Sequence, residues 1–421
     1  MIKIKRFINP AGLNKLEQII DKRRISKSNN IPVVLKILKD IRSNKNKALK
    51  KYENKFSNNK RLKPSKTEIN KAINSLSPKI KKAIDFAYNR IFKYHSLQKA
   101  KNISFKDKFN NSLYYKFLPI NKVGIYVPAN LPSTLLMNAI PAKIAGVKKI
   151  ILANPRLNNK LNPAVIYAAK KMGIKEIYSI GGAQAIGSLA YIQKVDKIVG
   201  PGNIYVARAK KEVFGDVGVE GMVAGPSEIT VLADKKSELK SVVTSLIGQA
   251  EHDVNSQCIL ISKDVTLLKK ISKIIKSELK NLPRKNIAEQ SLKKNGLLIH
   301  ATTDKNIVDL INLISPEHLE LNVSKPKKYL NKIVNAGSIC IGKFSAMAVT
   351  DYNAGTNHVL PTMGSARFSS GLNVGDFYKK ISYVNLTKKG IEVIGKKAIT
   401  LAEYENLEGH AQSIKSRIRR N

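Results

Sequence analysis

Between Val123 and Gly342, short apolar runs alternate with helical segments, and this pattern constrains the fold more than any other feature of the sequence. The predicted strands are VGIYVP (123–128), KKIILANP (148–155), KEIYSIG (175–181), EITVLAD (228–234), SQCILIS (256–262), LLIHAT (297–302) and SICIG (338–342). The segments between them carry apolar residues at helical spacing. Because parallel strands need long crossover connections, the alternation predicts an α/β fold with parallel sheets covered by helices.

The alternation falls into two blocks, one beginning at Val123 and the other near Glu228. We therefore expect two α/β sheets of similar size. Residues 1 to about 115 are rich in Lys and have mainly helical spacing, so this region is predicted to be helical. After Phe377, a short tail contains a strand-like piece and a final helix over 399–420.

The charge of the chain is strongly positive, with 75 Lys and Arg against 30 Asp and Glu and a formal net charge of +45 at pH 7. Such a balance raises the possibility of a nucleic-acid-binding protein. The lysines are spread over the whole chain and do not form one stripe, which favours a Lys-rich solvated surface. We expect no specific nucleic-acid partner, and a steep salt dependence of binding would be the mark of the alternative.

The two cysteines, Cys258 and Cys340, lie far apart and form no CxxC pair, so neither a cysteine zinc site nor a disulfide framework is predicted. The N-terminal stretch has basic residues but lacks the apolar core of a secretory signal. No apolar run approaches the roughly 18 residues of a membrane span. A cytoplasmic protein with no membrane partner is the expectation.

Two short stretches combine histidine with other chemically useful side chains. In QAEH, Gln249 and His252 are three apart at the end of an apolar helix, where they would project together and could ligate a metal. In SPEHLEL, the Ser-Pro pair predicts a helix start with Glu317 and His318 in its first turn. An adjacent carboxylate and imidazole can share acid–base work. An ordinary helix end and a surface capping turn remain the alternatives.

Two further histidines lie in polar surroundings. The turn-rich stretch TDYNAGTNHVLPT holds Asp351 and His358 after a predicted strand, where α/β proteins often place reacting groups. The C-terminal EYENLEGH holds Glu405 and His410, which alone would be read as a solvated helix. His95 and His300 have no such neighbours and are expected to be structural.

Glycine-rich turns are the only local signal for a dinucleotide, and they are weak. GGAQAIG (181–187) and GPGN (200–203) each place glycines just before a helix, but the sequence has no GxGxxG motif. Glycine allows backbone N–H groups to approach a phosphate at a helix start, although such turns are also common where nothing binds.

Taken together, these segments closely resemble the histidinol dehydrogenase family. The resemblance runs in family order from about Val123 to Phe377 and includes EGHAQS near the C-terminus. The segments that carry it are VGIYVP, STLLMNAIPAKIAGV, GGAQAI, VDKIVGPGNIYVA, AGPSE, QAEHD, SPEHLEL, DYNAGTNHVLPT and GSARFSSGL.

The resemblance implies two Rossmann-like parallel-sheet domains with a helical N-terminal extension and a small C-terminal tail domain. The implied boundaries are an N-terminal helical arm at 1–22, a first α/β domain at 23–122 and 229–376, an NAD-binding domain at 123–228, and a tail at 377–421. The first α/β domain would carry most of the metal and acid–base residues, and the tail would contact a partner subunit.

The resemblance also implies the site residues. One Zn²⁺ per subunit would be held by Gln249, His252, Asp351 and His410, with Glu317 and His318 as the acid–base pair. Residues at the family's substrate-binding positions are Ser227, Gln249, His252, His318, Asp351, His358, Glu405 and His410. Residues at its NAD-binding positions are Tyr126, Gln184 and Asn203.

The implied reaction is the oxidation of L-histidinol to L-histidine through bound L-histidinaldehyde, with reduction of two NAD, in the last steps of histidine biosynthesis. His318 would take the hydroxyl proton, and Glu317 would help water add to the aldehyde. The resemblance further implies a homodimer in which His410 reaches the partner's site. A metal-dependent hydrolase of a related amino-acid derivative is the alternative, because the same ligands could activate water.

Overall fold

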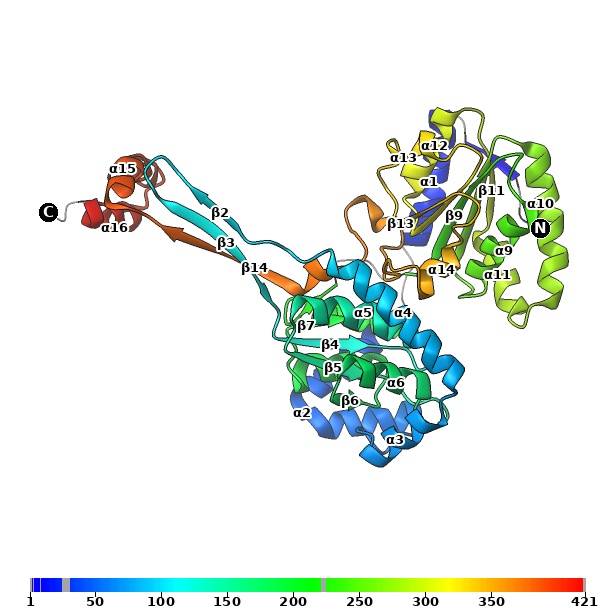
Figure 1. Cartoon of the computed structure of the whole chain (residues 1–421), viewed down its shortest axis with the longest axis horizontal. Helices are drawn as coiled ribbons and strands as arrows, with labels where there is room; N and C mark the ends of the chain where they lie inside the picture. The colour runs from blue at the N-terminus through cyan, green and yellow to red at the C-terminus, as the bar shows by residue number, and fades with distance from the viewer. Residues whose placement is uncertain (1, 3, 8, 25–30, 221–224, 419–421) are drawn as a thin grey trace.

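The computed structural model of the chain describes all residues except 1, 3, 8, 25–30, 221–224 and 419–421. Two parallel β-sheets flanked by helices form its main body, and a long antiparallel ribbon extends from that body to the C-terminal helices (Figure 1). The predicted α/β fold with parallel sheets is therefore confirmed. Within the described part of the chain, no helix combines the length and apolar character needed to cross a membrane.

The six-stranded sheet has the order β1-β11-β10-β9-β12-β13, and all of its strands are parallel. Its strands are β1 (Ile4–Arg6), β9 (Glu228–Ala233), β10 (Gln257–Ser262), β11 (Leu297–His300), β12 (His318–Asn322) and β13 (Ser338–Ile341). Its helices are α1 (Pro10–Arg24), α9 (Leu239–Ala250), α10 (Val265–Glu278), α11 (Lys285–Asn295), α12 (Asp304–Ile314), α13 (Lys327–Leu330) and α14 (Met347–Tyr352). The sheet is covered on both faces, with Leu260 of β10 in one core and Ile259 and Ile261 in the other.

The five-stranded sheet has the order β6-β5-β4-β7-β8 and is also parallel. Its strands are β4 (Lys122–Tyr126), β5 (Lys149–Ala153), β6 (Glu176–Tyr178), β7 (Lys197–Val199) and β8 (Gly218–Val219), and the helices between them are α5 (Pro132–Ala145), α6 (Pro163–Met172), α7 (Gly182–Gly187) and α8 (Ile204–Val213). Apart from β1, both sheets have the same strand order, in which the first strand of each block lies in the middle. This is the order of Rossmann-type sheets.

The N-terminal region packs differently from the implied boundaries. The helices α2 (Ile31–Ser57), α3 (Lys66–Ser75) and α4 (Pro78–Ser96) pack against the five-stranded sheet, although 23–122 was expected to join the other domain. Ile41 contributes to one core of that sheet and Ile91 to the other. Conversely, the expected helical arm at 1–22 begins with β1, which pairs with β11 of the six-stranded sheet.

The extended ribbon contains β2 (Ile103–Lys106), β3 (Ser112–Pro119) and β14 (Tyr378–Asn385), in the order β14-β3-β2. Helical structure was expected up to about residue 115, so the prediction was wrong for β2 and the start of β3. β3 pairs with β14, a segment more than 250 residues away, as in Ser112↔Asn385, and β2 pairs in turn with β3. The end of the ribbon carries α15 (Lys388–Tyr404) and α16 (Glu408–Ile418), where one final helix was predicted (Figure 1).

Candidate active site

The predicted acid–base pair lies where the chain enters β12. The expected helix start at Ser315 is wrong, because α12 ends there with Ser315 in the left-handed region (φ 50°) and β12 begins at His318. Both side chains are nonetheless buried, with 5% of Glu317 and 3% of His318 exposed. A buried carboxylate beside a buried imidazole needs specific partners, since unpaired burial of either charge is costly.

The main chain of Glu228, at the start of neighbouring β9, supplies such partners. Its N–H donates to Oε2 of Glu317 at 2.7 Å, and its carbonyl oxygen lies 3.1 Å from Nδ1 of His318. Because a carbonyl oxygen only accepts, Nδ1 of His318 carries a proton. In the neutral ring, Nε2 is then the atom able to take a proton, and it lies 3.5 Å from Oδ1 of Asp351.

The electrostatics of the pair follow from burial and from one another's charges. Burial raises the pKa of Glu317 to about 8, although His318 and the Glu228 N–H oppose the shift. Burial lowers the pKa of His318, but the charges of Glu317 and Asp351 outweigh this effect and raise it to about 9. Strongly shifted acid and base groups in one place are typical of active sites.

The predicted polar loop brings Asp351 and His358 to the same place. Asp351 lies at the end of α14, and its main-chain oxygen accepts a hydrogen bond from Nδ1 of His358 at 2.7 Å. Nε2 of His358 is 3.5 Å from Oγ1 of Thr134 at the start of α5, and Asn357 donates to the main-chain oxygen of Met137 at 2.7 Å. The loop is therefore held against a helix of the five-stranded sheet, so the site lies between the two sheets.

Gln249 and His252 lie near this cluster but do not share one helical face. Gln249 is buried in the last turn of α9, whereas His252 follows the end of that helix and is exposed. Burial opposes ionisation of Asp351, but the hydrogen bond with His318 and the nearby His318, His358 and His252 together lower the pKa of this carboxyl. Within the described residues, Nε2 of Gln249 is buried without a hydrogen-bond partner, which is costly for a group that contacts no ligand.

The nitrogen and oxygen donors of Gln249, His252 and Asp351 suit zinc, but three donors leave a tetrahedral site one ligand short. Among the described residues, no three His, Cys, Asp or Glu side chains come together as a metal site. The fourth predicted ligand, His410, is exposed on α16 beyond the ribbon, and Glu405 is exposed at the end of α15. Figure 1 shows these helices at the far end of the ribbon from α9 and α14.

The predicted site residues come from the amino edge of the six-stranded sheet and the carboxyl edge of the five-stranded sheet. Glu228 and His318 stand at the amino ends of β9 and β12, and Ser227 immediately precedes β9. The predicted NAD residues belong instead to the carboxyl edge of the five-stranded sheet, where Tyr126 ends β4 and Asn203 follows β7. Dinucleotides commonly bind at the carboxyl edge of such sheets.

The three predicted NAD residues are held in different ways. Oη of Tyr126 accepts a hydrogen bond from the Gly182 N–H at 3.4 Å, and the side-chain oxygen of exposed Asn203 caps the start of α8. The side chain of Gln184 is buried and donates to Oε1 of Glu53 at 2.8 Å. Sequence reasoning missed Glu53, because one Glu in a Lys-rich helix has no local signal that distinguishes it.

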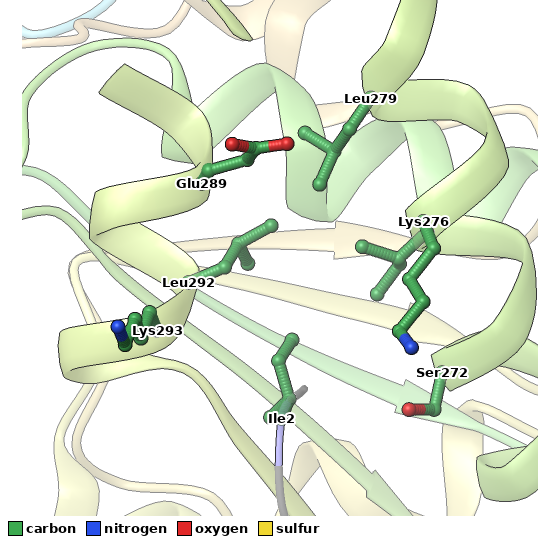
Figure 2. Close-up of a pocket in the computed structure, with 8 residues that line it drawn as sticks. Ile2, Ser272, Lys276, Leu279, Glu289, Leu292 and Lys293 are labelled. Atoms are coloured by element: carbon green, nitrogen blue, oxygen red, sulfur yellow. The ribbon is translucent and has the colours of Figure 1, made fainter. Parts of the chain in front are cut away.

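A separate pocket of about 370 Å³ lies between α10 and α11 and is distinct from this region. Figure 2 shows Lys276 and Leu279 on one side, Glu289 and Leu292 on the other, and Ile2 below them. None of the predicted site residues lines this pocket.

Comparisons with known proteins show which family the chain resembles. The family model described as histidinol dehydrogenase matches residues 20–418. The chain is 56% identical to a histidinol dehydrogenase of Pelagibacter ubique, over 100% of both chains, and 42% identical to one of Bacillus subtilis, over 92% and 93%. The crystal structure of histidinol dehydrogenase from Elizabethkingia anophelis superposes with a TM-score of 0.93 at 36% identity, covering 99% of this chain and 98% of that one. The chain therefore belongs to the histidinol dehydrogenase family, NAD-dependent oxidoreductases of histidine biosynthesis.

Proposed function

We propose that this enzyme oxidises L-histidinol to L-histidine in two hydride transfers to NAD, with zinc as the substrate anchor and L-histidinaldehyde kept bound between the steps. The observation that carries this proposal is the buried Glu317–His318 pair beside Asp351. Zinc would supply an electrophilic centre for the amino and imidazole nitrogens of histidinol.

The geometry suits His318 as the base in both oxidations. Its Nδ1 is held by the main chain of Glu228, so Nε2 can accept the hydroxyl proton while hydride leaves for NAD. Glu317 would then assist the addition of water to the aldehyde, and His318 would act again on the hydrate. Both groups act as bases only after losing a proton, and both have raised pKa values. We expect the rate to rise with pH above neutrality.

The remaining predicted contacts complete the proposed site. Gln249, His252 and Asp351 would bind the zinc together with His410 of the partner subunit, because the chain's own His410 belongs to α16, which lies beyond the ribbon. Ser227, His358 and the partner's Glu405 would contact the substrate. Tyr126, Gln184 and Asn203 would contact NAD. The active form would be a cytoplasmic homodimer with shared sites.

A combined measurement of NADH yield and metal content tests the proposal. Exhaustive conversion of histidinol should give two NADH per substrate at 340 nm, with one zinc per chain. His318→Ala should keep the zinc and lose most turnover, whereas His252→Ala should lose zinc. A hydrolase would form no NADH, and a His252→Ala variant with full metal and full rate would refute the ligand assignment.

A further inference from the structure

The carboxylate of Glu53 is the most completely enclosed acidic group near the predicted cofactor residues. Glu53 lies in α2 and is 1% exposed. Its Oε1 accepts hydrogen bonds from the Gly181 N–H at 2.9 Å and from Nε2 of Gln184 at 2.8 Å, and its Oε2 accepts one from Nδ2 of Asn59 at 3.1 Å. A helix distant in sequence thus contacts the turn between β6 and α7.

These contacts are unusual because none of the three donors carries a charge. Burial raises the pKa of Glu53, and the hydrogen bonds from Gly181, Gln184 and Asn59 oppose that shift. A buried acid that served only to pack α2 against the sheet could be replaced by an apolar side chain at lower cost. The arrangement therefore points to a requirement for a carboxylate at this position.

The Glu53 carboxylate orients the side chain of Gln184 at the Gly181–Gly182 turn. It holds the amide nitrogen of Gln184, whose Oε1 then lies over the turn, 2.8 Å from where a Cβ of Gly182 would be. The Gly182 N–H points to Oη of Tyr126. Two predicted cofactor residues, Tyr126 and Gln184, are therefore oriented by the turn that Glu53 holds.

The hydrogen bond between the Gly181 N–H and Glu53 makes this N–H unavailable to a bound ligand. In dinucleotide-binding turns, main-chain N–H groups at the helix start face the diphosphate. Here the Gly181 N–H already donates to Glu53, and a nearby carboxylate repels a phosphate. The start of α7 is thus closed to the phosphate groups of a cofactor.

We propose that Glu53 is a positioning residue for the cofactor, which fixes the Gly181–Gly182 turn and the Gln184 side chain while keeping the diphosphate away from the start of α7. This inference rests on the proposed assignment of Tyr126 and Gln184 to NAD. It predicts that loss of the carboxylate weakens NAD binding without changing zinc or histidinol binding.

The test measures NADH binding to the full-length, zinc-loaded protein by NADH fluorescence, alongside zinc content and the KM for histidinol. Glu53→Gln keeps the shape, but one of the two acceptor oxygens becomes an NH2 group that faces a donor. The dissociation constant should therefore rise about tenfold, as expected for the loss of one hydrogen bond to a charged group. The KM for histidinol and the zinc content should stay as in the wild type. Asn54→Ala, at an exposed position on the same helix, is the matched control and should bind NADH normally.

Glu53→Ala adds a rescue experiment that a purely structural role would not satisfy. Acetate can enter the space left by the carboxylate and accept the same hydrogen bonds, so acetate but not chloride should restore NADH affinity to Glu53→Ala. If Glu53→Gln fails to fold, rescue of Glu53→Ala decides the matter, and an absence of rescue overturns the proposal. Folded variants that bind NADH like the wild type also overturn it, whereas a wild type that binds no NADH refutes the proposed function itself.

Discussion

The separation of His410 from the other predicted ligands leads to a quantitative prediction about mixed dimers. In a shared site, the main body of one subunit supplies His252 and α16 of its partner supplies His410. His410→Ala and His252→Ala homodimers should each be inactive and poor in zinc. In a hybrid of the two variants, one site combines His252 of one subunit with His410 of the other, and the second site lacks both histidines.

Random exchange of equal amounts should make about half of the dimers hybrids, each with one intact site of two, so about a quarter of wild-type activity should return. The assay is co-refolding of the two variants, followed by NADH formation and zinc analysis. Hybrids isolated with two different tags should show about half of wild-type activity per dimer. If His410 served its own subunit, every site would lack one ligand and no activity would return. That result would refute the shared-site arrangement.

Three further predictions concern stability and are measured by urea or thermal unfolding. Lys210→Met should destabilise the protein by about 3–5 kcal/mol because Glu220 would stay buried without its cation, and the additional replacement Glu220→Leu should recover most of the loss. Gly200→Ala should lower the free energy of unfolding by several kcal/mol, because φ is +110° and the new Cβ would lie 2.0 Å from a main-chain oxygen. As the control, Gly248→Ala adds a Cβ that meets nothing within 4 Å and should change stability by no more than about 1 kcal/mol. Hydrogen bonds from the Ser65 N–H and two arginines lower the pKa of Glu68 to about 2. The stability that this carboxylate contributes is therefore present above about pH 4.5 and is lost as the pH falls to 2. The difference in Tm between the wild type and Glu68→Gln should vanish over that range.

The sequence predicted the type of most elements in the two sheets because their signals are local. The run EITVLAD becomes β9 and SQCILIS becomes β10, each buried throughout, as expected for central parallel strands. The helices between them follow the apolar spacing. The family resemblance, carried by long motifs, also brought together Glu317, His318, Asp351 and His358 before any geometry was known.

The features that the sequence could not predict depend on distant partners. The three residues of β1 form a strand only because β11 is there to pair with them. The amphipathic faces of α2 and α4 show that they pack on something but not on which sheet. The Ser-Pro pair at Ser315 resembles a helix start, yet the apolar strand that follows, paired on both sides, determines the backbone at His318. The carboxylate of Glu53 is matched to donors more than 120 residues away.

The ribbon has a consequence for how the enzyme reaches its active form. Its three strands expose Ile103, Phe105 and Val384 by more than half and have no hydrophobic core of their own. Such a small, uncovered sheet is only marginally stable in water. In the proposed dimer, its final ordering would therefore accompany the meeting of two chains, and the last phase of refolding should accelerate with protein concentration. Strong dilution should therefore release the proposed zinc before either parallel sheet unfolds.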